Sequence, residues 1–454
     1  MASHARQEEA VRDGQEPVRR GLGREVGMLL GTQLAALVLG MASSILVARL
    51  LGPAGKGAYT ILILYAAVCG LIGSAGVETA NTFFRGREQV APEALLGNTL
   101  IVTAGAALLV SVAWPIACLL IARTTSGMAT GPMVALAAAS VPAGVLGAGV
   151  RGILLGEYRI ALVCQLRLLQ AAASAGLIAV LLVGFGRTVS NALWAAVGSA
   201  ALCAVVGWCC LSSLGCTLPR WAPTSLSASL LYGARAQVAN LLQWANYRID
   251  HFLVGYWLPV RHVGIYSVAT GVAGLMWEFP GAVATVLFPR VARQGDQAAN
   301  AITPKVFRIV AVATLAQALV LGPLARPAIT LVFGSAFAPA AGPVLALLPG
   351  VVLLSLSKTL CGDLLGRGFP HFGAVASLVG LLATLVLDIA LIPRMGIMGA
   401  AIASSVSYGL STILMLRFFL RESDSTIVAL TRFRGEELRE GLRAARRAIG
   451  WHAK

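Results

Sequence analysis

The chain alternates long apolar runs with short polar segments over most of its length. Between residues 26 and 420, apolar runs recur that are long enough to cross about 30 Å of hydrocarbon as helices. Inside a bilayer, only helices and closed barrels satisfy their own backbone polar groups, and barrel strands show short alternating patterns instead of continuous apolar runs. The pattern therefore predicts an all-α polytopic membrane protein.

We predict about twelve transmembrane helices in two pseudo-symmetric six-helix bundles around a central cavity. The expected spans are 26–50, 57–82, 96–122, 131–153, 160–184, 190–213, 230–256, 263–288, 305–333, 340–361, 371–393 and 396–420. The ninth span contains Pro323 and Pro327. It is therefore either one long bent helix or a helix followed by a re-entrant piece.

Composition supports the membrane assignment. Charged residues make up only 12% of the chain, about half of their share in a soluble domain, and the mean hydropathy is +0.81. A net charge of +16 could indicate nucleic-acid binding, but the basic residues gather at span ends and in both tails, so we expect no nucleic-acid partner. Most of them fall on the side that holds the termini, which predicts that both termini are cytoplasmic.

Two local matches indicate an internal duplication. The segment LVARLLGPAGKGAYTI at 46–61 aligns with LVGYWLPVRHVGIYSV at 253–268, and GILLG at 152–156 aligns with GDLLG at 362–366. Both offsets are close to 210 residues, which predicts two related six-helix units that enter the membrane from the same side.

The duplication leads to a division of the chain into five parts. We expect a cytoplasmic N-terminal tail at 1–25, a first bundle at 26–215, a cytoplasmic linker at 216–229, a second bundle at 230–420 and a basic cytoplasmic tail at 421–454. The last tail is either a surface-lying amphipathic helix or a partly disordered segment.

Ionisable residues inside spans cost about 2.5–3.5 kcal/mol each, so each of them requires an explanation. The seventh span concentrates polar residues on an arc of about 140°. They are Arg235, Asn240, Gln243, Asn246, Tyr247 and Asp250. Either this face borders a polar cavity, with arginines for an anionic ligand and carboxylates for a cation or proton, or Arg235, Asp250 and Glu278 form buried ion pairs. Glu78 lies in the second span and Glu278 in the eighth. For Asp388, Lys358 and Asp363 the structural interpretation is favoured.

The sequence indicates neither a metal site nor a cofactor. The eight cysteines and five histidines have no ligand spacing. The segment GPAGKG at 52–57 is no phosphate-binding loop, because glycine follows the lysine where serine or threonine is required. We therefore expect a membrane transporter and not an enzyme.

Two segments resemble a known family. They are NYRIDHFLVGYWLPVRHVGIYSVATGVAGLMWEFPGAVATVLFPRVAR at 246–293 and ARLLGPAGKGAYTI at 48–61. Both resemble the polysaccharide transporters, the lipid-linked oligosaccharide flippases of the multidrug/oligosaccharidyl-lipid/polysaccharide superfamily. The resemblance implies an alternating-access flippase in the cytoplasmic (inner) membrane. Its substrate would be an undecaprenyl-diphosphate-linked glycan that moves from the inner to the outer leaflet.

The resemblance also suggests roles for the polar residues. Arg235 is the first candidate for binding the diphosphate and Arg248 the second, because guanidinium groups form forked hydrogen bonds with phosphate. Asp250 resembles the acidic position that follows the polar stretch of the seventh span in the family. With Glu78 and Glu278 it would face the cavity and could bind H+ or Na+ as coupling ion. Partners would be the lipid-linked glycan, the phospholipid bilayer and polysaccharide assembly proteins.

Other functions remain open at this point. A cation-coupled multidrug antiporter of the same superfamily would need an acidic, aromatic cavity. A lipid-linked peptidoglycan precursor flippase usually has fourteen spans and a charged first helix, whereas the first span here carries only Thr32, Gln33, Ser43 and Ser44 in its interior, with Arg49 at its end. A membrane scaffold without transport activity is the third alternative.

Overall fold

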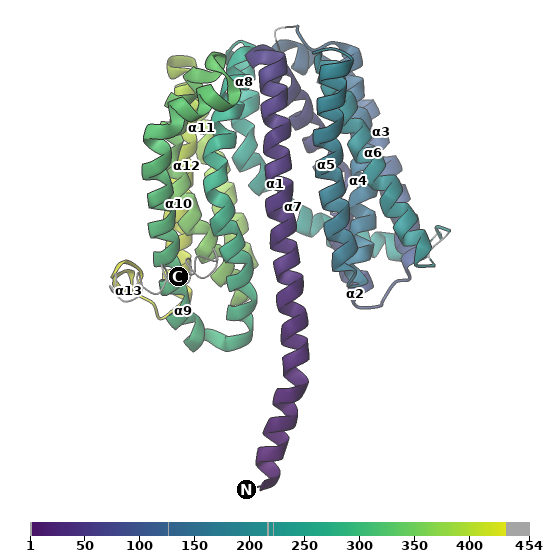
Figure 1. Ribbon diagram of the computed structural model, residues 1–454, viewed down its shortest axis with the longest axis vertical. Coiled ribbons are helices and arrows are strands. Elements are labelled where there is room, and N and C mark those ends of the chain that lie inside the picture. Colours follow the sequence, from purple (N-terminus) through teal and green to yellow (C-terminus); the bar gives the residue numbers. More distant parts are fainter. Residues whose placement is uncertain (1, 126, 216–217, 221, 433–454) are drawn as a thin grey trace, which may run out of the picture. The chain divides into compact units, whose positions relative to one another are not determined.

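The computed structural model describes the backbone of residues 2–125, 127–215, 218–220 and 222–432, and these residues form helices without any strand (Figure 1). The elements are α1 (Ala2–Gly73), α2 (Val77–Gly86), α3 (Pro92–Thr124), α4 (Gly131–Gly156), α5 (Ile160–Gly184), α6 (Val189–Ser213), α7 (Pro223–Trp257), α8 (Val260–Gly274), the 3-10 turn η1 (Leu275–Trp277), α9 (Glu278–Phe333), η2 (Ser335–Ala340), α10 (Ala341–Gly366), α11 (Pro370–Met395), α12 (Ile397–Glu422) and α13 (Ile427–Thr431). The prediction of an all-α polytopic membrane protein is confirmed. Most of the predicted amphipathic tail, from residue 433 onward, lies outside the described residues.

Ten stretches of the described helices are long and apolar enough to cross a membrane, two fewer than the twelve spans predicted. The first, Gly27–Gly73, has 47 residues and is far too long for one crossing. Its helical path breaks at Gly52, where φ is 66°. This stretch contains the first predicted span and most of the second. The seventh predicted span lies in α7, which is absent from the ten because it carries many polar residues.

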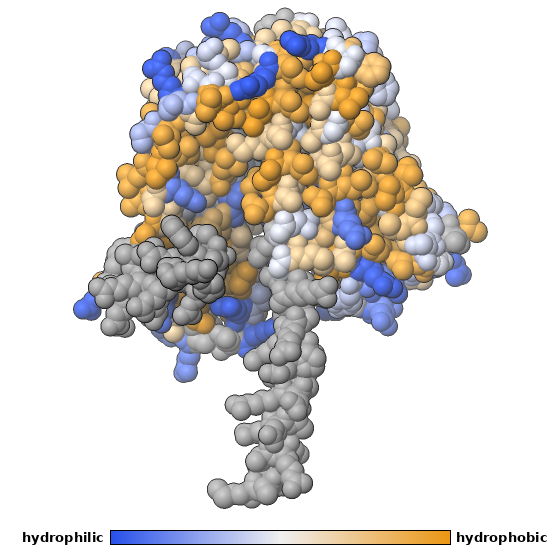
Figure 2. Space-filling model, in the orientation of Figure 1, coloured by the Kyte–Doolittle hydropathy of each residue, from blue (hydrophilic) through white to orange (hydrophobic). Residues whose placement is uncertain are grey.

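Apolar side chains cover a broad band of the surface drawn in Figure 2, and hydrophilic residues gather toward the edges of this band. Leu108, Val112, Ile116 and Leu119 of α3 are all more than 60% exposed. In a water-soluble protein such a surface would be an aggregation hazard, whereas in a bilayer it faces lipid.

The chain divides into two compact units. The first unit comprises Met1–Gly55, Leu62–Ala122 and Gly127–Val238, and the second comprises Lys56–Ile61, Arg123–Ser126 and Ala239–Lys454. The division falls within α7, so Arg235 belongs to the first unit and the polar residues from Asn240 onward belong to the second.

The two matched pentapeptides adopt the same local geometry in their respective units. Gly152 in α4 packs against the backbone of Glu78 in α2, and Gly362 in α10 packs against Ala284 in α9. After each pentapeptide the helix ends in the same way, with a residue at positive φ. This residue is Tyr158 (φ 55°) in the first unit and Gly368 (φ 92°) in the second. The same small residues thus allow close helix contact twice, as a duplication requires.

In each unit one long apolar helix is interrupted. In the first unit, residues 74–76 form a turn between α1 and α2, and the amide of Gln237 donates a hydrogen bond of 2.7 Å to the exposed carbonyl of Leu71. In the second unit, η1 separates α8 from α9. The helix that continues after each interruption has an acidic residue in its first turn, Glu78 in α2 and Glu278 in α9. Irregular backbone within a membrane is tolerated where it is buried in protein or borders a polar space, so both interruptions mark candidate sites.

The ninth predicted span is one helical stretch, Ala299–Phe333, without a re-entrant piece. It is the second part of α9. Leu287 and Val291 pack in one cluster with Ala299, Ile302 and Val306. A straight helix would separate Leu287 from Val306 by more than 25 Å, so α9 folds back on itself between these residues, as Figure 1 shows.

Candidate functional site

A cavity of about 450 Å³ with both polar and apolar walls lies within the second unit. Helices α7, α9, α10, α11 and α12 contribute its walls. Its polar lining residues are Gln243, Asn246, Tyr247, Thr285, Ser357, Lys358, Ser377 and Ser411. The volume is typical of a site for a small molecule or for part of a larger one. Amide and hydroxyl groups on several walls match a ligand rich in hydroxyl groups.

Tyr247 and Lys358 line the charged end of this cavity, and Trp277, which is not itself a lining residue, packs against both. Tyr247 and Trp277 are stacked with their ring centroids 5.3 Å apart. The Nζ atom of Lys358 lies 5.0 Å from the Trp277 centroid and 5.8 Å from that of Tyr247, which is within cation–π range. Glu278 is close enough to interact electrostatically with Lys358. A flat aromatic pair beside a hydrogen-bond donor can bind the apolar face and the hydroxyl edge of a sugar ring together.

A column of hydrogen bonds connects α7 with α11 and α12 beside the cavity. Thr384 donates to Ser407 over 2.7 Å, its hydroxyl also lies 3.4 Å from the Oδ1 of Asn246, and Ser407 donates to the carbonyl of Gly380. A side chain on Gly380 would collide with Ser411 and Asn246. The column therefore fixes the wall that holds Asn246.

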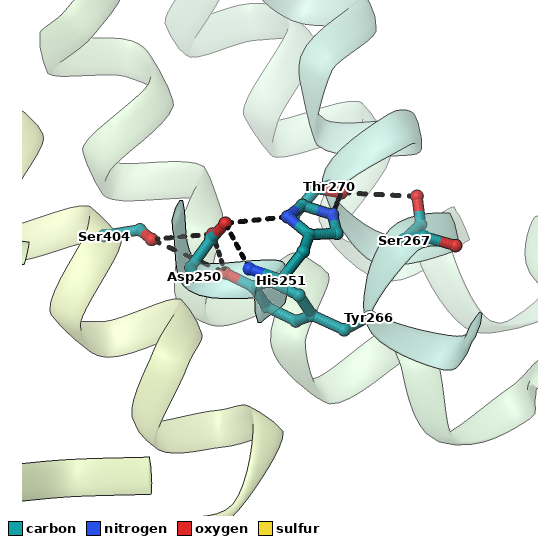
Figure 3. Close-up of polar contacts among 6 residues, drawn as sticks. All are labelled: Asp250, His251, Tyr266, Ser267, Thr270 and Ser404. Carbon is teal, nitrogen blue, oxygen red and sulfur yellow. Dashed lines mark hydrogen bonds and ion pairs between the residues drawn. The ribbon is translucent and has the colours of Figure 1, made fainter. Parts of the chain in front are cut away.

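Asp250 lies in a separate, sealed polar cluster of the second unit (Figure 3). Its Oδ2 accepts hydrogen bonds from the Tyr266 hydroxyl at 2.6 Å and from Ser404 at 3.4 Å. Its Oδ1 lies 2.7 Å from the Nδ1 of His251, and the other ring nitrogen of His251 lies 3.1 Å from the Thr270 hydroxyl. Only 2% of Asp250 is exposed. A buried carboxylate with this many partners is held firmly in place.

Asp388 lies near this cluster and is fully buried. Neither of its carboxyl oxygens has a hydrogen-bond partner among the described residues. A buried carboxylate without a partner is costly, which marks Asp388 as a candidate site for the uptake of a proton or a cation. Asp250 is the charged neighbour that interacts most strongly with the Asp388 carboxyl. Tyr266 and Tyr408 also interact with it electrostatically.

In the first unit, Glu78 lies between two arginines beside the helix interruption. One carboxylate oxygen lies 3.8 Å from Arg151 of α4, and the other lies 4.0 Å from Arg167 of α5. These are ion pairs without close hydrogen bonds. By contrast, Arg85 and Glu157 in the same unit form a hydrogen-bonded pair at 2.5 Å.

The residues predicted from the sequence fall into four groups. Gln243, Asn246 and Tyr247 line the cavity. Glu278 interacts electrostatically with Lys358, which also lines it. Asp250 lies in the sealed cluster, where the half-buried Arg248 is near enough to act on it electrostatically. Asn240 and Arg235 are exposed, and Glu78 is paired with arginines in the first unit. Their roles in binding stay predictions.

Sequence reasoning did not propose four residues of these sites. Lys358 and Asp388 were interpreted as structural, although each is an ionisable residue within an apolar span. Arg167 gave the same signal in the fifth span and was overlooked. Trp277 precedes Glu278, and no one-dimensional pattern shows that the helix is interrupted at this position or that the ring stacks on Tyr247.

Comparison with known proteins identifies the family. A family profile described as "Polysaccharide biosynthesis protein" matches residues 46–342, which is more than half of the chain. The chain belongs to this family. The resemblance inferred from the two segments at 48–61 and 246–293 is thereby confirmed. The profile covers the helix interruptions of both units and Arg151, Arg167 and Trp277.

Two relatives of the family come from Haloferax volcanii. One is named a probable low-salt glycan biosynthesis flippase and is 25% identical over 215 residues, which cover 43% of this chain and 44% of the relative. The other is named a probable flippase and is 26% identical over 218 residues, which cover 42% of this chain and 44% of that relative. The matched regions therefore span less than half the length of each relative.

Solved structures share the fold. A lipid II flippase, MurJ, in an inward closed conformation matches 94% of this polysaccharide biosynthesis family member with a TM-score of 0.76 and 14% identity, over 93% of its own chain. An inward-facing multidrug resistance MATE family transporter of the MOP superfamily matches 88% of the chain with a TM-score of 0.68 and 15% identity, over 96% of its own chain. At this identity the likeness establishes the fold and nothing about the substrate.

Proposed function

We propose that the chain is an alternating-access flippase that moves a lipid-linked oligosaccharide or polysaccharide repeat unit from the inner to the outer leaflet of the cytoplasmic membrane. Membership of the polysaccharide biosynthesis family and the names of the two relatives support this proposal. So does the fold, which occurs in both a lipid flippase and drug transporters.

The cavity of the second unit is the observation that carries the proposal. Sugar hydroxyls cannot enter hydrocarbon without hydrogen-bond partners, because each unsatisfied polar group costs several kcal/mol. The cavity offers amides, hydroxyls, a lysine and the ring of Tyr247, on which Trp277 stacks, inside an otherwise apolar bundle. A cationic drug would meet the like charge of Lys358 there, so the lining favours a glycan over such a drug.

We propose that Arg235, Arg248, Asn240, Gln243, Asn246 and Tyr247 contact the substrate, and that Asp250, Glu78 and Glu278 serve as carboxylates of the transport path. Both termini would be cytoplasmic, as the distribution of lysine and arginine predicts. Polysaccharide assembly proteins would act on the same substrate before and after its transfer.

Purified protein in liposomes should move a fluorescent lipid-linked oligosaccharide between leaflets. A quencher added outside reports the outer-leaflet fraction, and protein-free liposomes give the background rate. A panel of cationic drugs is tested in the same liposomes. Drug transport without glycan transfer would indicate that the protein is a multidrug antiporter and not a flippase. Absence of both activities would indicate a scaffold.

We further propose that Asp388 and Asp250 form the coupling site for H+ or Na+. Asp388 lacks a hydrogen-bond partner among the described residues, while Asp250 is held by His251, Tyr266 and Ser404. Reversible uptake of a cation at Asp388 would reorganise this cluster and the helices α7, α8 and α12 that carry it.

An Asp388→Asn variant should therefore lose the stimulation that an imposed proton or sodium gradient gives to glycan transfer. The amide is isosteric with the carboxyl and removes only its ability to take up the ion. The measurement compares transfer rates with and without each gradient, and Asp424→Asn provides an exposed control. Gradient stimulation that persists in Asp388→Asn would exclude this carboxyl as the coupling site.

A further inference from the structure

A short segment that follows the last long helix turns back onto the second unit. We call residues 423–432 the C-terminal strap; they contain the five-residue helix α13, which Figure 1 shows beside α9. Thr426 caps α13, since its side chain accepts a hydrogen bond of 3.2 Å from the amide of Ala429. A helix this short is not stable alone, so its contacts with the unit keep the strap in place.

The strap is attached mainly through two neighbouring residues of α13. Leu430 is only 2% exposed and packs in one apolar cluster with residues of three long helices. The buried partners in this cluster are Leu360 and Leu364 of α10, Ala376 of α11, and Met415 and Phe419 of α12. The guanidinium group of Arg308 in α9 donates a hydrogen bond to the carbonyl of Ala429. This attachment is small, so the strap can detach by a local opening that leaves the long helices folded.

The apolar cluster beneath the strap is also a wall of the cavity. Ala376 and Met415 belong to the cluster and line the cavity, and Cys361 packs against the cluster and lines the cavity as well. Leu365 in the last turn of α10 and Gly373 in the first turn of α11 are further lining residues. The cavity therefore extends toward the helix ends against which the strap packs.

The beginning of the second part of α9 connects the strap to the end of α10. Thr303 donates a hydrogen bond of 2.6 Å to the fully buried Asp363 of α10, whose other oxygen lies 2.6 Å from the Nε of Arg367. Arg308, which binds the strap, lies five residues after Thr303. Helices α9 and α12 both contribute walls of the cavity, so the strap, which follows α12 and binds α9, joins two of these walls.

We propose that the C-terminal strap is a releasable latch that holds the cavity closed at this end. While Leu430 is packed, the adjoining ends of α10, α11 and α12 stay together. When the strap detaches, these ends separate and the cavity opens there to solutes. The strap then slows one half of an alternating-access cycle, a consequence that rests on the proposed function.

Labelling of Cys361 in the purified full-length protein reports this opening. A water-soluble maleimide is added in detergent, and peptide mass spectrometry follows the labelled fraction of Cys361 with time. Leu430→Ala should raise the labelling rate about tenfold or more, because truncation of a buried leucine shifts such an equilibrium by at least this factor. Arg308→Gln removes the hydrogen bond to Ala429 and should raise the rate as well. Leu430→Met keeps the apolar volume and should leave the rate unchanged.

Two controls separate release of the strap from general loosening of the unit. Val428→Ala is the matched control, because Val428 is on the same helix and is 63% exposed. Leu347 is 2% exposed in α10, and about 21 Å of helix separates it from Cys361. Leu347→Ala should therefore lower the thermal midpoint without changing the labelling of Cys361. Unchanged labelling in a folded Leu430→Ala variant, or an equal increase in either control, overturns the proposal. If Leu430→Ala does not fold, Arg308→Gln decides in the same way.

The outcome is separable from that of the proposed function. In liposomes, Leu430→Ala should transfer lipid-linked glycan faster than the unmodified protein, and slower transfer would overturn the role of the strap as a latch. If Cys361 labelling rises as expected but no glycan moves, the strap stands and the flippase function fails. If glycan moves and Cys361 labelling does not respond to Leu430→Ala, the function stands and the strap is overturned.

Discussion

Replacing Lys358 by alanine is expected to lower the rate of glycan transfer by one to two orders of magnitude. The ammonium group lies over Trp277 and Tyr247 at the charged end of the cavity, where it can donate hydrogen bonds to substrate oxygens. A hydrogen bond from a charged group contributes about 1.5–3 kcal/mol, which corresponds to about 10–150-fold in affinity or rate. The liposome assay measures this loss directly.

Lys305→Ala is the matched control, because Lys305 is exposed in α9 and lies outside the cavity. Its transfer rate should equal that of the unmodified protein. Thermal unfolding in detergent should show that both variants remain folded. Normal transfer by a folded Lys358→Ala variant would show that neither Lys358 nor the charged end of the cavity contacts the substrate during transfer.

A Gly152→Val substitution is expected to destabilise the first unit by about 3 kcal/mol or more. A Cβ atom at this position would overlap the backbone of Glu78, and backbone cannot move aside as a flexible side chain can. Overpacking usually costs about 1–3 kcal/mol, and the backbone collision places this site at the upper end. The expected observation is a lower thermal midpoint together with a reduced yield of folded protein.

Two further glycine variants calibrate that effect. Gly176→Val changes an exposed glycine of α5 whose Cβ would meet nothing within 4 Å, so its midpoint should stay close to that of the unmodified protein. The thermal midpoint of Gly362→Val should lie between those of Gly152→Val and Gly176→Val, because its Cβ would lie 3.0–3.2 Å from Ala284. Equal midpoints for Gly152→Val and Gly176→Val would contradict the close contact between α4 and α2.

The spans and the duplication could be predicted because both depend on local pattern. Apolar length alone establishes a membrane helix, and the pentapeptides at 152–156 and 362–366 repeat because each must allow a neighbouring helix to approach. The predicted number of twelve spans was not confirmed, since ten stretches of the described helices qualify. The first two predicted spans merge into one helical stretch that breaks only at Gly52, and α7 is too polar to qualify by hydropathy.

The polar face of the seventh span was predicted as one surface, and the structure divides it. Gln243, Asn246 and Tyr247 open into the cavity, whereas Asp250 is enclosed by His251, Tyr266 and Ser404. Helical periodicity gives the direction of a side chain from its own axis. It contains no information about which neighbouring helix covers each turn of that axis.

The sequence by itself determined that this chain is an all-helical membrane protein of the polysaccharide biosynthesis family, and it predicted an internal duplication. These properties follow from hydrophobic length and from residues near each other in the chain. Only the tertiary structure placed Lys358 over Trp277, left Asp388 without a hydrogen-bond partner in the described part of the chain and set Arg151 and Arg167 near Glu78. Such contacts join residues far apart in the chain, and the packing of helices decides which of them meet.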